Sequence, residues 1–493
     1  MIKYVLTYLL LQVGFAVSSQ QAYFKEFDNS YSEVFYDVAE TNNGFIICGT
    51  TELANAEPIN DNDAYLVKID EQGSVVWSKI LNEDYHERFE RIHYAHDSYY
   101  IVGTTHSKNS NGNRKFWKYS QNGELLLSVD FGDSVLAWYD NRIFEFLDVG
   151  DGFIVAGSGS ADTATITDGE LIKLDYSGNV LWSQRYTYDV GSTTADMVKG
   201  IKQEDNGFIM LLHSYTSDTP NHSEHIIKTD LLGNELWRKN VTNYSIPNEF
   251  ALAGMTNRPT AIAPYQNGYV MVAQAQDEFE RTFRTYLIQL DGDGNEVEVT
   301  AFLDSIDHTV FNIYTNTQDE IFVLGLDMTE YSVTDWAWQH QVIKWDGTDN
   351  LMWKKRNGAD NIINWHSNGI QTKDGSFISV GHIFRAPTPR RNPIIVKTDC
   401  QGNIEWDYTP CSINDDNTPL IFPNPSSGIY HIQFNEEIDV SIYVYDLNGR
   451  IVNEMSEVNS SVLNLDLSSL SRGVYSYRMV LDGEIVFGKL IKQ

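Results

Sequence analysis

Short alternations of hydrophobic and polar residues, separated by tight turns, run through most of this chain. The clearest example spans residues 171–182: an apolar strand, the turn Asp175-Tyr176-Ser177-Gly178, and a returning strand that carries Trp182. Such alternation on both sides of a turn predicts a β-hairpin rather than a helix. Glycine supplies the left-handed backbone that this turn requires, and the aspartate carboxylate accepts hydrogen bonds from turn amides.

The same phrase recurs at intervals of roughly 50 to 60 residues, in the range of one propeller blade. The turn residues are Gly73, Gly123, Gly178, Gly233, Gly294 and Gly402, with Asp349 in a seventh copy. Four positions later stand the tryptophans Trp77, Trp182, Trp237, Trp353 and Trp406. Two positions before the turn aspartate, or before Ser120 in one copy, stand Lys68, Lys118, Lys173, Lys228, Lys344 and Lys397. A pattern this regular indicates repeated structural units.

A second hairpin precedes each copy of the phrase. It has an alternating strand, a turn such as Asp205-Asn206-Gly207, and an apolar strand that often ends in glycine, as at Gly49, Gly103 and Gly157. One repeat is therefore four short antiparallel strands. Seven such sheets around an axis predict an all-β fold, a seven-bladed β-propeller over residues 20–410. A continuous β-solenoid is the alternative, although its coils are usually shorter than this period.

The start of the repeats predicts how the ring closes. Residues 23–38 align without gaps on residues 77–92, so that Tyr23 takes the place of Trp77. We therefore expect an N-terminal strand that pairs with the last blade and removes two sheet edges at once. The segment from Ile404 to Tyr408 competes for the same place. One of the two segments must lie outside that blade or extend it.

The two ends of the chain have different patterns. Residues 1–19 have a positive start at Lys3, an apolar run and small residues, which predicts a secretory signal peptide. Residues 411–419 form a polar linker. Residues 420–493 contain several short strands and predict a small Ig-like β-sandwich. Because no other apolar stretch is long enough to span a bilayer, we expect a mature chain without a transmembrane segment.

Charge and cysteines narrow the choice of partners. The 493-residue chain has 68 acidic and 35 basic residues and a formal net charge of −33, which argues against nucleic acid. Cys48 lies in an apolar strand and is expected to be a buried thiol. A disulfide between Cys400 and Cys411 stays open: an oxidising compartment favours it, whereas an extended strand of that length would hold the two apart.

The tail contains five short motifs in order. They are Pro423-Asn424-Pro425-Ser426-Ser427-Gly428, Val444 to Arg450 with Asp446 and Gly449, Leu465 to Leu470, Gly473-Val474-Tyr475, and Lys489 to Lys492. With these motifs, about 75 residues of the tail resemble the type A C-terminal sorting domain of the type IX secretion system (Por secretion) of Bacteroidetes. The resemblance implies export through the periplasm to the outer cell surface or the medium. It also implies that residues 420–493 engage the secretion machinery.

The repeats resemble those of exported Bacteroidetes propellers and of quinoprotein-type propellers, in which an Asp–Gly turn precedes a tryptophan that docks on a neighbouring blade. This resemblance implies blade docking by Trp77, Trp182, Trp237, Trp353 and Trp406. We expect each to sit on the terminal glycine of the adjacent blade's apolar strand. A quinone cofactor is not expected, because the chain lacks an adjacent cysteine pair and an eighth repeat.

We find no catalytic or metal-binding motif. There is no serine elbow and no His-Glu-x-x-His pair, and His93, His96, His222 and His225 are too scattered for a metal site. The segment from Asp291 to Asn295 has calcium-type oxygens, but the later positions of such a loop do not match, which favours a plain turn. Trp336, Trp338 and Trp365, with His366, offer surfaces for stacking on sugars, although structural or docking roles are favoured.

The sequence therefore predicts a secreted or cell-surface binding or adhesion propeller without catalytic residues or cofactors. Its extracellular ligand, glycan or protein, is not identified. The alternative is a secreted hydrolase that acts on polysaccharide at the propeller mouth. Abundant acidic residues keep that alternative open, because no catalytic pair can be chosen among them.

Overall fold

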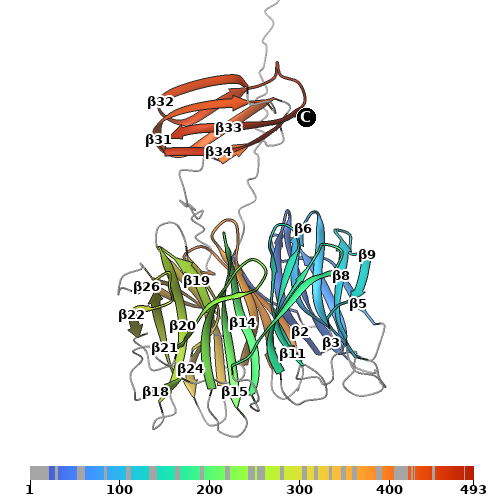
Figure 1. Ribbon diagram of the computed structural model, residues 1–493. Coiled ribbons are helices and arrows are strands. Elements are labelled where there is room, and N and C mark those ends of the chain that lie inside the picture. The colour runs from blue at the N-terminus through green and yellow to red at the C-terminus, as the bar shows by residue number, and fades with distance from the viewer. Residues whose placement is uncertain are drawn as a thin grey trace, which may run out of the picture. The chain divides into compact units, whose positions relative to one another are not determined.

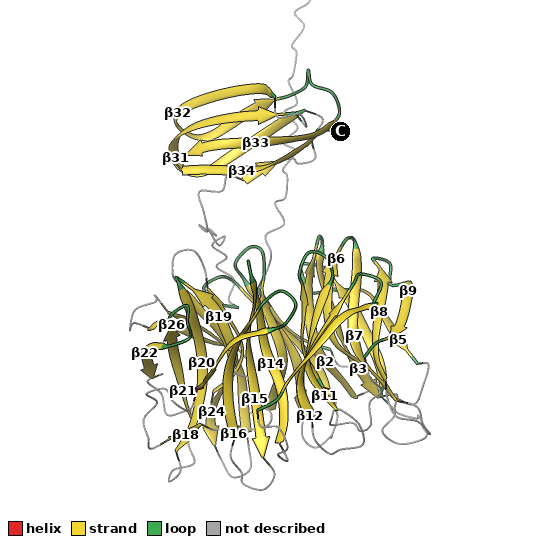
Figure 2. Ribbon diagram, in the orientation of Figure 1, coloured by secondary structure: helices red, strands yellow, loops and turns green. Residues whose placement is uncertain are grey.

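The protein is described here from a computed structural model. It describes residues 22–27, 32–52, 62–82, 86–106, 113–132, 142–160, 167–188, 194–216, 222–241, 250–252, 261–277, 283–301, 308–315, 320–331, 336–345, 351–357, 363–384, 391–404, 420–422, 426, 428–446, 450–481 and 484–492. The named elements among these residues are all strands (Figure 2). They fall into two compact units, β1 to β29 and β30 to β34, which we describe separately.

The first four sheets each contain four antiparallel strands that follow one another along the chain (Figure 1). They are β2 (Ser32–Thr41), β3 (Gly44–Glu52), β4 (Asp63–Ile69) and β5 (Val75–Leu81); β6 (His86–Ala95), β7 (Ser98–His106), β8 (Asn113–Ser120) and β9 (Leu125–Asp130); β10 (Ile143–Asp148), β11 (Phe153–Ser160), β12 (Thr167–Leu174) and β13 (Val180–Tyr186); and β14 (Thr194–Glu204), β15 (Gly207–Thr216), β16 (His222–Thr229) and β17 (Glu235–Asn240).

The remaining strands of this unit form two larger sheets. One has β18 (Phe250–Leu252), β19 (Ala261–Tyr265), β20 (Gly268–Asp277), β21 (Phe283–Leu290) and β22 (Glu296–Ala301). The other has β23 (His308–Thr315), β24 (Ile321–Tyr331), β25 (Trp336–Trp345), β26 (Leu351–Asn357), β27 (Ile363–Gln371), β28 (Phe377–Phe384), β29 (Arg391–Thr398) and β1 (Tyr23–Glu26). A single parallel pair, Trp338 with Ile363, joins two groups of four strands within this second sheet.

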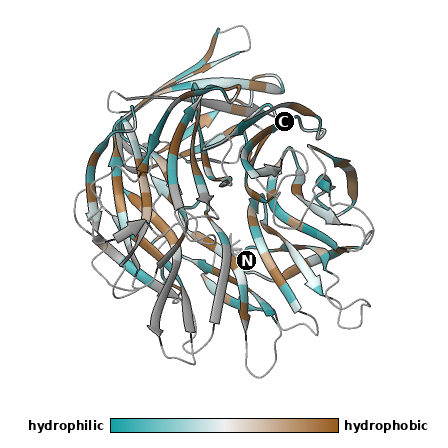
Figure 3. Ribbon diagram, turned by 60° about the horizontal axis from the view of Figure 1, so that its bottom comes forward, coloured by the Kyte–Doolittle hydropathy of each residue, from teal (hydrophilic) through white to brown (hydrophobic). Residues whose placement is uncertain are grey.

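The first strands of successive groups surround a common axis. Among the described strands, β2, β6, β10, β14, β19, β23 and β27 contact one another in this order, and β27 contacts β2 again. Figure 3 shows the groups arranged as a ring. This arrangement is that of a β-propeller, and we interpret the seven groups as its blades.

The N-terminal strand closes the ring, as the sequence predicts. Strand β1 pairs with β29 in antiparallel register, with Tyr23 opposite Lys397 and Glu26 opposite Ile394. The last blade therefore takes its fourth strand from the beginning of the chain. Of the competing segment, Ile404 is not in a strand, and its other residues lie outside the described part of the chain.

Burial follows strand position within a blade. In the first blade every residue of β4 is buried, as are eight of the nine residues of β3, whereas most of β5 is exposed. The middle strands are covered on both faces because neighbouring blades pack against each other. One core cluster, for example, joins Leu66 of the first blade to Phe89 and Trp117 of the second. This double burial explains why these strands read as nearly continuous apolar runs.

A β-bulge in the first strand explains the terminal glycines. The register shifts between Phe35 and Asp37, and Gly49 lies opposite Phe35. A Cβ built on Gly49 would lie only 1.9 Å from the Val34 carbonyl oxygen, and Gly103 and Gly157 approach their partner strands equally closely. These glycines therefore allow close backbone approach at the bulge.

The predicted Asp-x-x-Gly turn is confirmed. Gly178 has a left-handed φ of 80°, and its N–H donates to the Asp175 carbonyl at 3.0 Å. The Asp175 carboxylate accepts hydrogen bonds from the N–H groups of Ser177 and Asn179 at 2.8 and 2.9 Å. The turns at Asp70, Asp230, Asp291 and Asp399 repeat this arrangement.

The second unit is a small β domain around its own core. Its strands are β30 (Leu420–Phe422), β31 (Ile429–Tyr445), β32 (Ile451–Asp466), β33 (Gly473–Leu481) and β34 (Glu484–Lys492). The longest of these strands, β31, is irregular, and its later half pairs with both β32 and β33. Its core includes Tyr430, Ile442, Leu465 and Met479. The Ig-like assignment stays a prediction.

The structure describes two of the three cysteines, Cys48 and Cys400. Cys48 is a buried free thiol, as expected. Cys400 is disulfide-bonded. The proposed partner, Cys411, lies outside the described residues, so the pairing of Cys400 with Cys411 stays a prediction.

Candidate functional site

Polar side chains from several first strands meet around the propeller axis. In five blades the residue that follows the bulge is polar, and in a sixth a lysine two residues further along takes its place. We call this set the axial ring. Its members are Asp37, Arg91, Glu145, Lys202, Asn312 and Asn368.

Direct hydrogen bonds connect the axial ring across blades. The Asn368 amide donates to Asp37 Oδ1 at 2.7 Å, which joins the last blade to the first. Lys202 Nζ donates to Asn312 Oδ1 at 3.0 Å. Arg91 Nε donates to the Phe144 carbonyl at 2.6 Å, beside Glu145. These contacts hold the inner strands at fixed distances around the axis.

Small residues explain how Lys202 reaches so far. It lies in the fourth blade and bonds Asn312 in the sixth, past the first strand of the fifth. At the ring position the fourth blade has Gly200, and the fifth has Ala261 opposite Val272. Neither residue has a side chain large enough to enter the ring. The Lys202 side chain fills the space that they leave and also lies over the Tyr314 ring, 5.6 Å from its centroid.

The ring balances its own charges. Two carboxylates, Asp37 and Glu145, face two cations, Arg91 and Lys202. Burial raises the pKa of both carboxyl groups, and the nearby cations oppose this increase. Burial likewise lowers the pKa of Lys202, against the attraction of Glu145. Charges removed from water need such partners, so the ring is electrostatically self-contained.

The hydrogen bonds of Asp37 limit its chemistry. Its carboxylate accepts bonds from the Val38 and Ile92 N–H groups, each at 2.9 Å, in addition to the Asn368 amide. Three of the roughly four lone-pair sites of this carboxylate are therefore already used within the protein, which leaves little capacity to bond a substrate. The charge of Glu145 interacts with those of Lys202 and Arg91. The axial ring thus resembles a structural hub more than a catalytic centre.

The tryptophans contact a different glycine from the one expected. A Cβ on the turn glycine Gly123 would lie 3.0 Å from Cζ3 of Trp77 in the preceding blade. Trp182 approaches Gly233 at 3.0 Å and Trp237 approaches Gly294 at 2.6 Å by the same measure. The expected seat, the terminal glycine of the apolar strand, was wrong, because the bulged strand's own backbone already occupies the space beside that residue.

Where the tryptophan is missing, other aromatic rings take the same place. Tyr23 of β1 lies against Gly73, 2.6 Å from the position of its Cβ, so the closing strand seats on the first blade. Phe116 lies against Gly178, next to the blade that has Leu127 instead of tryptophan. The left-handed turn glycine therefore has a second use: it leaves room for a ring from the preceding blade.

Several predicted aromatic residues cannot be placed. The side chains of Trp353, Trp336, Trp338 and Trp365 lie outside the described part of the structure, as does the whole of Trp406. Their assignment to docking or to sugar stacking stays a prediction.

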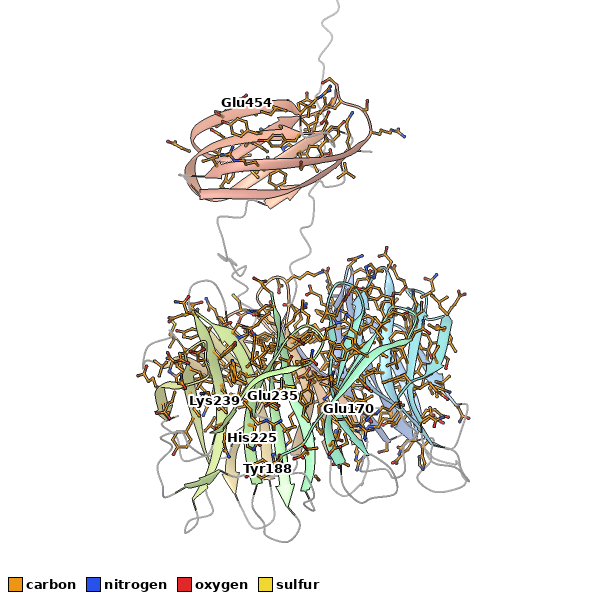
Figure 4. All side chains as sticks on the ribbon, in the orientation of Figure 1. Glu170, Tyr188, His225, Glu235, Lys239 and Glu454 are labelled. Atoms are coloured by element: carbon orange, nitrogen blue, oxygen red, sulfur yellow. The ribbon has the colours of Figure 1, made fainter. Side chains whose placement is uncertain are left out.

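A second polar cluster lies within the fourth blade. His213 Nδ1 and Glu224 Oε1 are 2.5 Å apart, and both side chains are buried. Lys199 is 5% exposed, and its Nζ has no hydrogen-bond partner among the described residues. His225 stacks near Tyr188, with ring centroids 4.8 Å apart (Figure 4). Lys199, His213 and Glu224 come from three adjacent strands, and His225, which follows Glu224 in β16, points to the other face of the sheet. Of the histidines named in the sequence analysis, His225 lies in this blade, whereas His93 lies in the second blade.

The calcium-like segment is used as a turn. Asp291 Oδ1 accepts bonds from the N–H groups of Asp293 and Asn295 at 3.0 and 2.8 Å, and the Asn295 amide donates to Asp291 Oδ2 at 2.9 Å. Both carboxylate oxygens therefore serve the turn itself. Within the described residues, no group of three or more His, Cys, Asp or Glu side chains is arranged to hold a metal ion.

The sorting-signal residues have mainly structural surroundings. Gly428 has φ +134°, and a Cβ there would lie 2.7 Å from Ser468 Cα. Asp446 Oδ1 accepts the Arg450 N–H at 2.9 Å, and Tyr475 OH donates to the Ser471 carbonyl at 2.7 Å. Gly473 begins β33 in open space. Pro423, Asn424, Pro425, Gly449 and the Lys489 side chain lie outside the described residues.

Sequence reasoning included Lys492 in the closing motif but gave it no role, and it missed the axial ring. Lys492 Nζ donates to the carbonyls of Ser468, at 2.9 Å, and of Leu470, which ties the last strand to the loop after β32. The ring positions carry a usable signal: one polar residue at the same place in the first strand of five repeats. Aligning the first strands of the repeats, rather than their turns, would have found them.

Trp182 tests the contact between blades. Replacing it with alanine should lower the free energy of unfolding by about 3 kcal/mol, because the ring that covers Gly233 is lost. Leu181→Ala is the matched control: Leu181 is 54% exposed, so its loss should cost less than about 0.5 kcal/mol. Denaturant unfolding of both variants measures the difference, and equal costs would count against the contact.

Buried histidines predict acid sensitivity. Burial, with Arg238, lowers the pKa of His225 to about 4, and burial lowers that of His340 to about 3. Since the unfolded chain binds these protons near pH 6.5, stability should be full above that pH and fall as the pH drops toward 4. Thermal unfolding of wild type and His225→Phe between pH 7.5 and 4.5 checks this. The variant should lose less stability in acid; identical pH profiles would refute the role of His225.

Comparisons with known families divide the chain into two parts. Residues 420–493 match the model of the secretion system C-terminal sorting domain. Residues 146–382, less than half of the chain, match the arylsulfotransferase (ASST) model. No curated protein matches the sequence. In the described residues, no helix is long and apolar enough to cross a membrane.

Similar solved structures are distant. The β-propeller domain of the Trilobed protease from Pyrococcus furiosus is 10% identical, with TM-score 0.41, and the match covers 78% of this chain and 98% of that one. Polysaccharide lyase Uly1 is 11% identical, with TM-score 0.47, over 74% of this chain and 89% of that one. A protein of unknown function from Dyadobacter fermentans DSM 18053 is 10% identical, with TM-score 0.41, over 76% and 99%.

Structural similarity at such low sequence identity does not identify an activity, because one fold hosts many activities. The tail is different, because its family match and its sequence motifs agree. The chain is therefore a β-propeller protein that carries a type IX C-terminal sorting domain and is marked by it for export.

Proposed function

We propose that this protein is an exported binding or adhesion module of the cell surface or the surrounding medium, without catalytic activity of its own. The observation that supports this most directly is the axial ring. A polysaccharide hydrolase with its site at the propeller mouth would place unpaired acidic and aromatic groups in a deep axial pocket. Here Asp37 and Arg91, and Glu145 and Lys202, are partners of opposite charge instead.

The charge balance also weakens the hydrolase alternative. Glycoside hydrolysis needs one carboxylate as acid and another as base or nucleophile, both directed at the same bond. Asp37 already accepts three hydrogen bonds, and the charge of Lys202 interacts with that of Glu145. Binding needs no such pair: a rigid scaffold with many surface loops suffices.

A combined screen tests the proposal. Purified residues 20–418 are applied to glycan and protein arrays, and the same preparation is assayed for polysaccharide hydrolysis and for transfer of sulfate from an aryl sulfate. We expect saturable binding and no turnover. Turnover that Glu145→Gln abolishes while the variant remains folded would overturn the proposal and place catalysis at the axis.

A second candidate is sulfate transfer, which rests on the arylsulfotransferase match over residues 146–382. That range includes the fourth-blade cluster, where Lys199 and His225 are buried polar groups without a hydrogen-bond partner in the described structure. Loss of aryl sulfate turnover in His225→Phe and Lys199→Met, but not in Glu145→Gln, would favour this candidate.

The sorting domain gives a direct prediction for export. Removing residues 420–493 should leave the propeller folded in the periplasm, because the two units have separate cores. Fractionation and surface proteolysis of cells that express the truncated and full-length chains measure delivery. Normal surface delivery of the truncated chain would contradict the role assigned to the tail.

A further inference from the structure

A polar cavity lies at the seam where the ring closes. It has a volume of about 380 Å³ and is lined by Glu40, Thr41, Asn42, Gly44, Phe45, Glu71, Lys373 and Asp374. The lining therefore comes from the first hairpin of the first blade, from its Asp-x-x-Gly turn, and from the first hairpin of the last blade. A hydrogen bond from the Lys373 N–H to Glu40 Oε2, 2.8 Å long, crosses the seam.

The repeated lysine of the third strand shows what is unusual here. In four other blades this lysine bonds the first hairpin of its own blade. Lys68 Nζ donates to the Asn43 carbonyl at 2.9 Å, and Lys344 Nζ lies 2.6 Å from Glu320 Oε1. Lys173 pairs with Asp151, and Lys228 pairs with Glu204. In these four blades the lysine thus has a partner in the hairpin.

In the last blade both members of this pair keep unused bonding capacity. Lys397 is 0% exposed, and its Nζ has no hydrogen-bond partner among the described residues. Asp374 uses Oδ1 to accept the Ser376 N–H and the Thr372 hydroxyl, and its buried Oδ2 has no partner in the same set. Lys397 lies among the cavity carboxylates Asp374, Glu40 and Glu71, which interact with its charge.

The cavity lining defines the ligand chemistry. It offers the carboxylates of Glu40, Glu71 and Asp374 beside Lys373, so a ligand must supply donors and acceptors close together. A purely cationic amine would face Lys373, and an anion would face the three carboxylates. Neutral hydroxyl groups both donate and accept. The volume lies at the lower end of the range of small-ligand pockets.

We propose that this seam cavity binds a short neutral saccharide through Glu40, Asp374 and Lys373. The proposal rests on the binding function proposed above and names its ligand class and site. Because the cavity is shared by the first and last blades, a bound saccharide also strengthens the closure that β1 makes with β29.

The test uses the full mature chain and an array of neutral mono- and disaccharides, followed by calorimetric titration with the best binder. Asp374→Asn and Glu40→Gln should each raise its Kd at least tenfold. Glu320→Gln, which changes the hairpin carboxylate of the neighbouring blade, is the matched control and should leave Kd within twofold. Thermal unfolding of each variant shows whether it is folded at the titration temperature.

Asn42→Trp provides a variant that does not disturb the buried groups, because Asn42 is exposed at the cavity lining. It should abolish binding while the fold is retained. Unchanged binding in all three cavity variants would overturn the proposal but leave a binding function elsewhere intact. Binding of a simple amine or of a protein, but of no neutral saccharide, would likewise overturn the proposed site and ligand class without contradicting a binding function. Turnover of a substrate would instead overturn the proposed function itself.

Discussion

The packing of blade on blade is the constraint from which the rest of this structure follows. The middle strands are apolar on both faces, so no blade can bury its core alone. Every blade needs two neighbours, and a row of blades would leave an apolar face at each end. Closing the row into a ring removes both faces, and β1 fastens the closure by pairing with β29. The core at the seam includes Tyr23 of β1 with Phe35 and Ile378.

The repeated residues serve this ring in distinct ways. Terminal glycines such as Gly103 let the second strand approach a bulge, and turn glycines such as Gly123 receive an aromatic ring from the preceding blade. The bulge in turn sets the polar residue that follows it toward the axis. Regularity in the sequence thus reflects architecture, and the departures from regularity carry the information about function. Gly200 and Ala261 shape the axial ring, and Glu40, Lys373 and Asp374 line the seam cavity.

Much of the fold could be predicted from local sequence. Period-two alternation, the Asp-x-x-Gly turns and the likeness of Tyr23 to Trp77 were enough for the hairpins, the four-strand unit and the closing strand. Contacts between blades could not be predicted in the same way, because they depend on how far the sheets twist and where the bulges lie. The tryptophan seat failed for this reason: two glycines per repeat offered space, and only the bulge shows that one of them is already occupied. The axial ring escaped notice because its members differ in charge and type, so only their shared strand position connects them.

The account depends most on closure of the ring by the N-terminal strand. Lys25 and Ile395 are register partners in β1 and β29. Cysteines introduced at both positions, with Lys25→Cys and Ser183→Cys of the third blade as a control pair, test this arrangement by peptide mapping under oxidising conditions. The account predicts a new intramolecular disulfide for the first pair alone, together with a higher unfolding temperature. Failure to form it, or a disulfide only between molecules, would contradict the closed ring.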